Sequence, residues 1–135
     1  MASIDTNVLV RFLINDDPEQ FDMARNVIDA ARKSSGLFIC TSVILELEWV
    51  LRSRYALSKQ EFIQVIIQLL ETRELLFESE AILERALSLY QESNIDFADC
   101  IHVAVAMTHD QTPMYTFDRK ASRTNGFSLP DVQQE

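Results

Sequence analysis

Four acidic residues of this chain lie where an α/β fold would bring them together. Asp5 follows the first short apolar segment, and Glu46 lies near the start of the helix that follows the second. Asp99 opens a later helix, and Asp118 follows the last apolar segment. Because parallel strands direct the residues that follow them to one edge of a sheet, we expect the four carboxylates to converge there.

Carboxylates gathered within a few ångströms repel one another, which raises their pKa values and costs stability unless a cation lies among them. No suitable set of His or Cys residues accompanies the four acids. An all-oxygen set favours Mg²⁺ or Mn²⁺ over Zn²⁺. Such an ion keeps bound waters, and one of these can attack a phosphate that the ion neutralises. The pattern therefore predicts phosphate chemistry.

The elements that position these acids centre on residues 93–107, SNIDFADCIHVAVAM, a helix so apolar that it should be packed on most sides. Two interpretations of its acids stay open. In one, Asp96 is the N-cap and accepts a backbone N–H, while the negative charge of Asp99 in the first turn interacts favourably with the helix dipole. In the other, Asp99, with or without Asp96, faces the shared acidic site. The positions of the other acids favour the second, and His102 is interpreted as a surface or packing residue.

Short apolar segments alternate with helical patterns along the rest of the chain, which predicts an α/β domain with a mostly parallel sheet. We expect strands ending at residues 3–4 and spanning 37–40, 75–77 and 114–117. In the third expected helix Glu48 lies about 200° round from Glu46, so the two cannot face one site. The expected helix starts are Thr6 as a cap, the turn 15–18, Thr41 or Ser42 as a cap, the capping box of Ser58 and Glu61, and Ser79 as a cap.

The composition predicts a single domain over residues 1–135. The chain has only two glycines and three prolines, which leaves little room for linkers. Cys40 and Cys100 are interpreted as free, buried thiols. No run of 18 apolar residues and no signal peptide is found, so we expect a cytoplasmic protein with no membrane association. A net charge of -9 opposes general attraction to nucleic acid, so any such attraction must be local.

Local positive charge occurs directly after Asp118, where Arg119, Lys120 and Arg123 form either a solvated loop or a contact to RNA phosphates. Thr6 and Thr116 are each either structural or groups that orient a nearby ligand. We interpret Trp49 as a core residue.

Four motifs resemble those of a known family when taken in this order. They are Ile4-Asp5-Thr6-Asn7, Val43-Ile44-Leu45-Glu46-Leu47, Asp96-Phe97-Ala98-Asp99 and Thr116-Phe117-Asp118-Arg119. With these intervals, and over essentially the whole chain, they resemble the PIN-domain ribonucleases, most closely the VapC toxins of VapBC toxin–antitoxin pairs.

The resemblance implies a three-layer α/β/α PIN-like domain with a mostly parallel central sheet. It also implies Mg²⁺-dependent hydrolysis of RNA, with Mn²⁺ as a substitute, inhibition by a cognate antitoxin protein, and a homodimer. Family members vary at the fourth acid. By motif match the resemblance implies that Asp5, Glu46, Asp99 and Asp118 are catalytic and that Asp96 is accessory. From the residues themselves we add Asp5 and Asp99 as metal-binding, Thr6 and Thr116 as accessory, and Arg119, Lys120 and Arg123 as RNA-binding candidates.

Two rival functions use Asp5 differently. A haloacid-dehalogenase-like phosphatase needs a second Asp two residues after the first, and Asn7 occupies that position. A phosphoacceptor receiver domain needs an acidic pair at the first strand and a Lys after the last, whereas Asp5 stands alone and Asp118 occupies the later position. Both remain alternatives to the nuclease.

Overall fold

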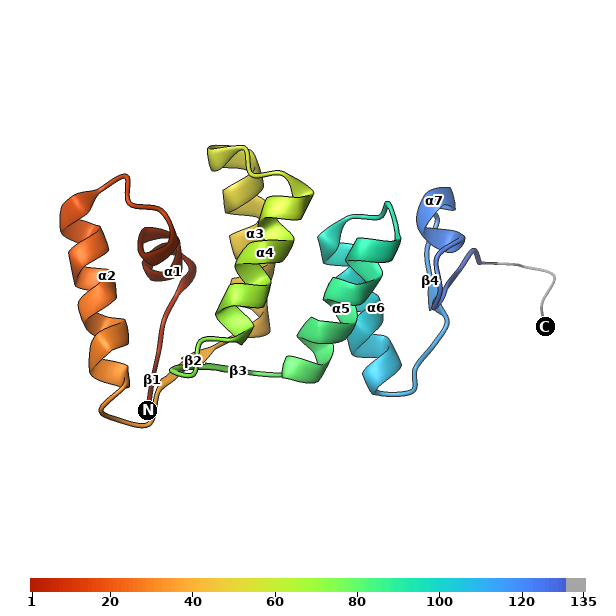
Figure 1. Cartoon of the computed structure of the whole chain (residues 1–135). Coiled ribbons are helices and arrows are strands. Elements are labelled where there is room, and N and C mark those ends of the chain that lie inside the picture. The colour runs from red at the N-terminus through yellow and green to blue at the C-terminus, as the bar shows by residue number, and fades with distance from the viewer. Residues whose placement is uncertain (131–135) are drawn as a thin grey trace. The chain divides into compact units, whose positions relative to one another are not determined.

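The computed structural model of the chain describes residues 1–130. It divides into two compact units, Met1–Glu78 and the part that begins at Ser79. Figure 1 labels the helices and strands of both units. Each unit is described by itself.

The first unit alternates strands and helices around a three-stranded sheet. The strands lie in the order β1-β2-β3, and both pairs are parallel, with Ser3 opposite Phe38 and Leu37 opposite Leu75. Two helices connect each strand to the next, as parallel pairing requires of a crossover. The elements are β1 (Ala2–Ser3), α1 (Thr6–Leu13), α2 (Pro18–Ala31), β2 (Leu37–Ile39), α3 (Thr41–Tyr55), α4 (Lys59–Leu70) and β3 (Leu75–Phe77).

Helix starts in this unit follow the sequence signals in part. Both halves of the predicted capping box of α4 are present, with Ser58 accepting from the Glu61 N–H and Glu61 accepting from the Ser58 N–H. Two predicted caps are wrong. Asp5, not Thr6, is the N-cap of α1, and Cys40, not Thr41 or Ser42, is the N-cap of α3. The strand ends one residue earlier than expected in each case, so the helix starts directly at the threonine.

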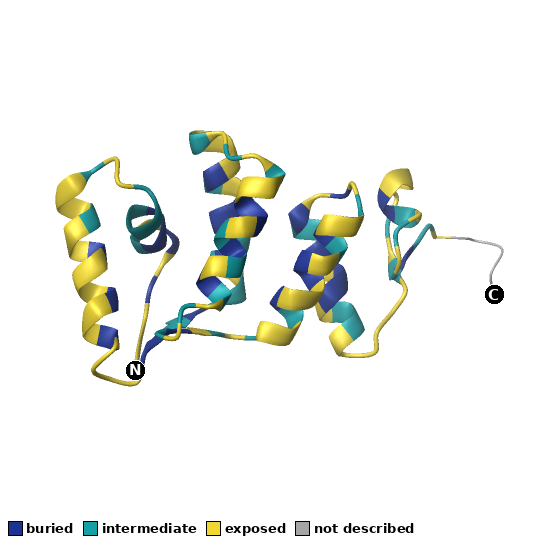
Figure 2. Cartoon of the chain, viewed as in Figure 1, coloured by how far each residue is buried: buried dark blue, intermediate teal, exposed yellow. Residues whose placement is uncertain are grey.

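The core of the first unit is formed by aliphatic side chains from β2 and the inward faces of α1 to α4 (Figure 2). Trp49 does not belong to it: 55% of its surface is exposed, so its interpretation as a core residue is wrong. The fully buried members are Leu9, Ile28, Ile39, Ile44, Leu47, Leu51, Ile63, Ile66 and Leu69.

The second unit consists of α5 (Glu80–Glu92), α6 (Phe97–Thr108), β4 (Met114–Tyr115), α7 (Arg119–Ser122) and β5 (Phe127–Ser128). Helices α5 and α6 lie side by side (Figure 1), and the Tyr90 and Phe97 rings meet edge to face with centroids 5.3 Å apart. Ser79 caps α5 as predicted, by accepting from the Ile82 N–H. Ile101, Val103 and Ala104 of α6 are buried; His102 and Val105 are exposed, so packing covers less of the helix than expected.

The C-terminal part of this unit differs from the expected strand 114–117. Strand β4 is shorter, and it pairs in parallel with β5, which the sequence did not predict. Gly126 at φ +93° precedes β5, where a Cβ atom would lie 2.6 Å from a Val103 methyl, so the close approach to α6 requires glycine. Arg119, Lys120 and Arg123 lie on α7 and at its end, not in a loop.

The predicted α/β class with parallel strands is confirmed, since every strand pair in residues 1–130 is parallel. Cys40 and Cys100 are free, as expected, although Cys40 is only half-buried. None of the described helices is both long and apolar enough to cross a bilayer.

Candidate functional site

The first group of predicted site residues lies at the carboxyl ends of β1 and β2. These strands are parallel neighbours, and the Ile4 N–H continues their pairing by donating to the Phe38 carbonyl at 3.3 Å. Helices α1 and α3 therefore begin at the same edge of the sheet. Asp5 enters α1 there, and Glu46 lies in the second turn of α3.

Thr6 connects the two helix starts. Its side chain is buried, with 4% of its surface exposed, and its hydroxyl donates a hydrogen bond to Oε1 of Glu46, which is itself exposed. Asp5 Oδ1 accepts the Val8 N–H at 3.0 Å, which is the N-cap bond that Thr6 was expected to make. Thr6 thus positions a predicted catalytic carboxylate instead of capping the helix.

A cavity of ≈ 420 Å³ opens beside these groups. Glu48 takes no part in it: its buried carboxylate pairs with Arg52 of the next turn at 2.8 Å, in agreement with the prediction that Glu46 and Glu48 face different ways. Because two carboxylates and a guanidinium line it, the cavity suits a polar ligand. Its lining residues are Asp5, Thr6, Asn7, Glu46, Trp49, Val50 and Arg54.

Arg54 was missed by the sequence reasoning. The signal was available, because Glu46, Trp49, Val50 and Arg54 follow the i, i+3, i+4, i+8 spacing of neighbours along one side of a helix. Once Glu46 is placed in a site, this spacing predicts that the other three lie beside it.

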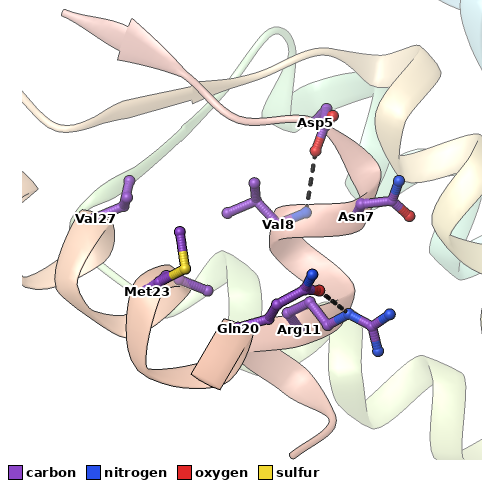
Figure 3. Close-up of a pocket in the computed structure, with 8 residues that line it drawn as sticks. Asp5, Asn7, Val8, Arg11, Gln20, Met23 and Val27 are labelled. Atoms are coloured by element: carbon purple, nitrogen blue, oxygen red, sulfur yellow. Dashed lines mark hydrogen bonds between the residues drawn. The ribbon is translucent and has the colours of Figure 1, made fainter. Parts of the chain in front are cut away.

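A second, mostly apolar cavity of ≈ 310 Å³ also includes Asp5 and lies between α1 and α2 (Figure 3). Val8 of α1 and Met23 and Val27 of α2 contribute its apolar surface. Arg11 borders it, held by the Gln20 amide oxygen at 2.7 Å. Asp5 therefore lies at the border of a polar cavity and an apolar one.

In the second unit, Asp99 is electrostatically coupled to two other predicted site residues. Its half-buried carboxyl has a pKa raised above the ordinary value, first by burial, then by the negative charge of Asp96 and also by that of Asp118, while His102 acts in the opposite direction. Asp96 occupies the N-cap position of α6, but its side chain makes no capping hydrogen bond, so the predicted cap bond is wrong. Both carboxylates are thus available to a ligand.

Asp118 and Thr116 form a local structure at the end of β4. The Asp118 N–H donates to the Thr116 hydroxyl oxygen at 3.1 Å. The Asp118 carboxylate then caps α7, by accepting from the N–H groups of Lys120 at 2.9 Å and Ala121 at 3.1 Å. Thr116 therefore helps to orient Asp118, and Asp118 fixes the short helix that carries the basic cluster.

The structure brings the predicted residues together in two groups. Asp5, Thr6 and Glu46 lie together in the first unit, and Asp96, Asp99 and Asp118 interact in the second. Within either unit, residues 1–130 contain no group of three or more His, Cys, Asp or Glu side chains arranged to hold a metal ion. The convergence of all four acids stays a prediction.

Comparisons with known proteins cover both units. A family model described as "PIN domain" matches residues 2–126. The chain is similar to a VapC ribonuclease of Aquifex aeolicus (strain VF5), at 23% identity over 100% of this chain and 99% of that protein. It is also similar, at 25% identity and a TM-score of 0.36, to a chain from a toxin-antitoxin complex from Klebsiella pneumoniae, over 97% of this chain and 98% of that one.

Proposed function

Because the match to its family model covers nearly its whole length, the chain belongs to the PIN-domain family, and we propose that it is an endoribonuclease. It hydrolyses RNA phosphodiester bonds and acts as the toxin of a toxin–antitoxin pair. The observation that carries the proposal is that each unit gathers acidic side chains at helix starts. Asp5 and Glu46 border one cavity, and Asp96 and Asp99 lie at the N-cap and in the first turn of α6. The similarity to a VapC ribonuclease supports the same activity.

The two units form a single PIN-like domain over residues 1–135 in this proposal, with a three-layer α/β/α arrangement. The family match supports this, because it runs from residue 2 to residue 126 across the division between the units at Ser79. In this proposal the acids of both units act together. All four then form one site.

The residues present fit a divalent cation bound through oxygen. Within the described chain the available donors are carboxylates. The pKa of Asp99 is raised first by burial and then by the negative charges of Asp96 and Asp118, and a bound cation would offset those charges. Asp5 and Asp99 would hold Mg²⁺, or Mn²⁺ in its place, with Glu46 and Asp118 completing the acidic set. When bound, such an ion neutralises charge on a phosphate and lowers the pKa of a water that can attack it.

The remaining side chains position these ligands and the substrate. Thr6 orients Glu46 through its hydroxyl, and Thr116 binds the backbone N–H of Asp118. Asp96 adds negative charge beside Asp99, which strengthens the attraction of this region for a cation. Arg119, Lys120 and Arg123 supply the local positive charge that an acidic chain needs to bind RNA phosphates.

The proposed partner is a cognate antitoxin, a small protein that covers the acidic edge and whose basic side chain pairs with the carboxylates. The apolar residues of α4 are buried or half-buried and offer no such partner an exposed surface. Three exposed apolar residues line the two cavities that include Asp5: Trp49 of α3 lines the polar one, and Met23 and Val27 of α2 line the apolar one. A homodimer and a cytoplasmic location complete the proposal.

Amide substitutions in each unit test the proposed site. Asp5→Asn and Asp99→Asn keep the shape of each side chain while removing its charge, so each is expected to reduce RNA cleavage by orders of magnitude and to weaken Mn²⁺ binding. Asp22→Asn, at an exposed acid of α2 paired with Arg25, is the control and should match the wild type. Retained cleavage in both site variants would overturn the assignment.

The same purified protein can be used to distinguish the nuclease from the two rival functions. Incubation with acetyl phosphate produces a stable phosphoryl-aspartate at Asp5 if the chain is a phosphatase or a receiver domain, and none if it is the proposed nuclease. Sequencing of RNA ends after brief induction then identifies the RNA that is cleaved.

A further inference from the structure

An exposed aromatic side chain lies directly beside Asp118. Phe117, between β4 and α7, has 86% of its surface exposed, the largest value among the large apolar residues of the described chain. Its ring contacts no other aromatic ring within residues 1–130. Tyr115, two residues earlier, is also exposed at 59%. Since Phe117 contributes little packing to its unit, its position next to a predicted catalytic acid calls for a functional explanation.

Three cations follow Phe117, two on the short helix α7 and one at its end. Arg119, Lys120 and Arg123 are exposed, and none of their side chains forms an ion pair or a hydrogen bond in the part of the chain that the structure describes. Because Asp118 accepts the Lys120 N–H, the position of this helix is tied to the acid itself. The backbone that carries the positive charge is therefore held next to Asp118.

Two of these cations border a cavity in the same unit. This cavity, of ≈ 340 Å³, lies where the segment between α5 and α6 meets the segment between α7 and β5. Lys120 and Arg123 line it together with the side chains of Asn94, Thr124 and Asn125. Glu92 also lines it, and as the one acid there it leaves a net positive charge. Such a cavity suits a nucleotide, because cations can bind its phosphate and amide groups can form hydrogen bonds with the edge of its base.

We propose that Phe117 and the cavity bordered by Lys120 and Arg123 form a binding surface for single-stranded RNA. A base of the substrate stacks on the Phe117 ring, and phosphates of the adjoining nucleotides bind Lys120 and Arg123, so the strand passes Asp118 between them. This inference rests on the proposed function and names how its substrate is held. An aromatic face beside cations is how proteins bind unpaired RNA, whereas a protein partner would not require the phosphate-binding charge.

Binding can be measured apart from cleavage by using the intact protein in excess chelator. The probe is a fluorescein-labelled, unstructured RNA of about ten nucleotides, a length within the site sizes of single-strand binders, followed by anisotropy. Phe117→Ala should weaken binding by about 5-fold to 150-fold, the equivalent of one stacked base. Phe117→Trp should restore it, and Phe117→Leu, which is apolar but lacks a π face, should not. Val105→Ala, at an exposed apolar residue of α6, is the matched control.

The salt dependence separates stacking from phosphate contact. The double variant Lys120→Ala/Arg123→Ala should reduce the slope of log affinity against log salt by about 1.4, because each phosphate contact on a single strand contributes about 0.7. Phe117→Ala should leave the slope unchanged. Arg85→Ala, which removes an exposed cation from α5, is the charge control and should change neither the affinity nor the slope.

The outcomes distinguish this inference from the function on which it rests. If the protein cleaves RNA but Phe117→Ala and the double variant bind the probe like the wild type, the binding surface is wrong while the nuclease stands. Retained RNA affinity in Phe117→Ala together with lost binding of a partner protein would assign the aromatic residue to that partner. If the wild type neither binds nor cleaves RNA with Mg²⁺ or Mn²⁺, the nuclease itself is wrong.

Discussion

Thr6→Val deletes one hydroxyl and nearly preserves the shape of a buried side chain. The lost group donates to Glu46, and because Glu46 is exposed, water can replace that donor. The expected cost is therefore the net value of one hydrogen bond, about 0.5–1.5 kcal/mol, and not the larger penalty of a buried unpaired charge. For a domain of this size, it corresponds to a fall of roughly 2–6 °C in Tm, measured by thermal unfolding.

Cleavage should respond more strongly than stability to the same change. Without its donor the Glu46 carboxylate is free to rotate. Loss of a group that orients a carboxylate of a metal site should cost about 10-fold to 100-fold in activity, as loss of the groups around metal ligands typically does. Thr6→Ser is the control, because it keeps the hydroxyl and should keep most of the cleavage. Full activity in Thr6→Val would refute the positioning role. A second check adds Thr6→Val to Glu46→Ala. If Thr6→Val costs as much stability in that background as in the wild type, the lost stability does not come from the Thr6–Glu46 hydrogen bond, and the positioning role is refuted as well.

Three further predictions concern the acids and one cap. Because the pKa of Asp99 is raised, the native state binds the proton of Asp99 more tightly than the unfolded state does. The stability of the metal-free protein should therefore fall as pH rises from the ordinary pKa of 3.8 through the raised one. Asp99→Asn should flatten this fall in thermal unfolding. Because the Asp96 side chain makes no cap bond, Asp96→Asn should leave the helix content unchanged by circular dichroism and reduce cleavage only in part, and a clear loss of helix would contradict this. Ser58→Ala should cost about 1 kcal/mol of unfolding free energy at neutral pH. The pKa of Glu61 is lowered first by its hydrogen bond from the Ser58 backbone N–H, so wild-type stability should fall as acid protonates Glu61. If Glu61→Ala leaves this fall unchanged, the reciprocal cap is wrong.

Periodicity and end signals predicted the larger elements of the fold. The capping box at Ser58 and the apolar spacing after it placed α4, and the turn before Pro18 placed α2. These signals succeed because each is local: a side chain and a backbone N–H three residues apart, or an apolar face one helical turn apart. Strand β5 was missed because two residues, Phe127 and Ser128, are too few to show a period of two.

The wrong assignments concern side chains whose surroundings in the folded chain cannot be read from local spacing. Thr6 can cap a helix by sequence, but the parallel pairing of β1 and β2 brings Glu46 close enough to take its hydroxyl. Asp96 sits where an N-cap should but makes no capping bond. Trp49 fits the apolar content of α3, yet its position beside Glu46 turns it toward the cavity. Spacing alone cannot choose between such partners.

The most direct test of the proposed nuclease is RNA cleavage by the purified protein, free of any inhibitor, as the divalent cation is varied. The acidic set offers no electrophile other than a bound cation, so cleavage should occur with Mg²⁺ or Mn²⁺, stop in excess chelator, and return when the ion is restored in excess. Asp99→Asn should remain inactive under all three conditions. Undiminished cleavage in excess chelator would contradict the metal-dependent mechanism, and no cleavage of any RNA with either ion would contradict the nuclease itself.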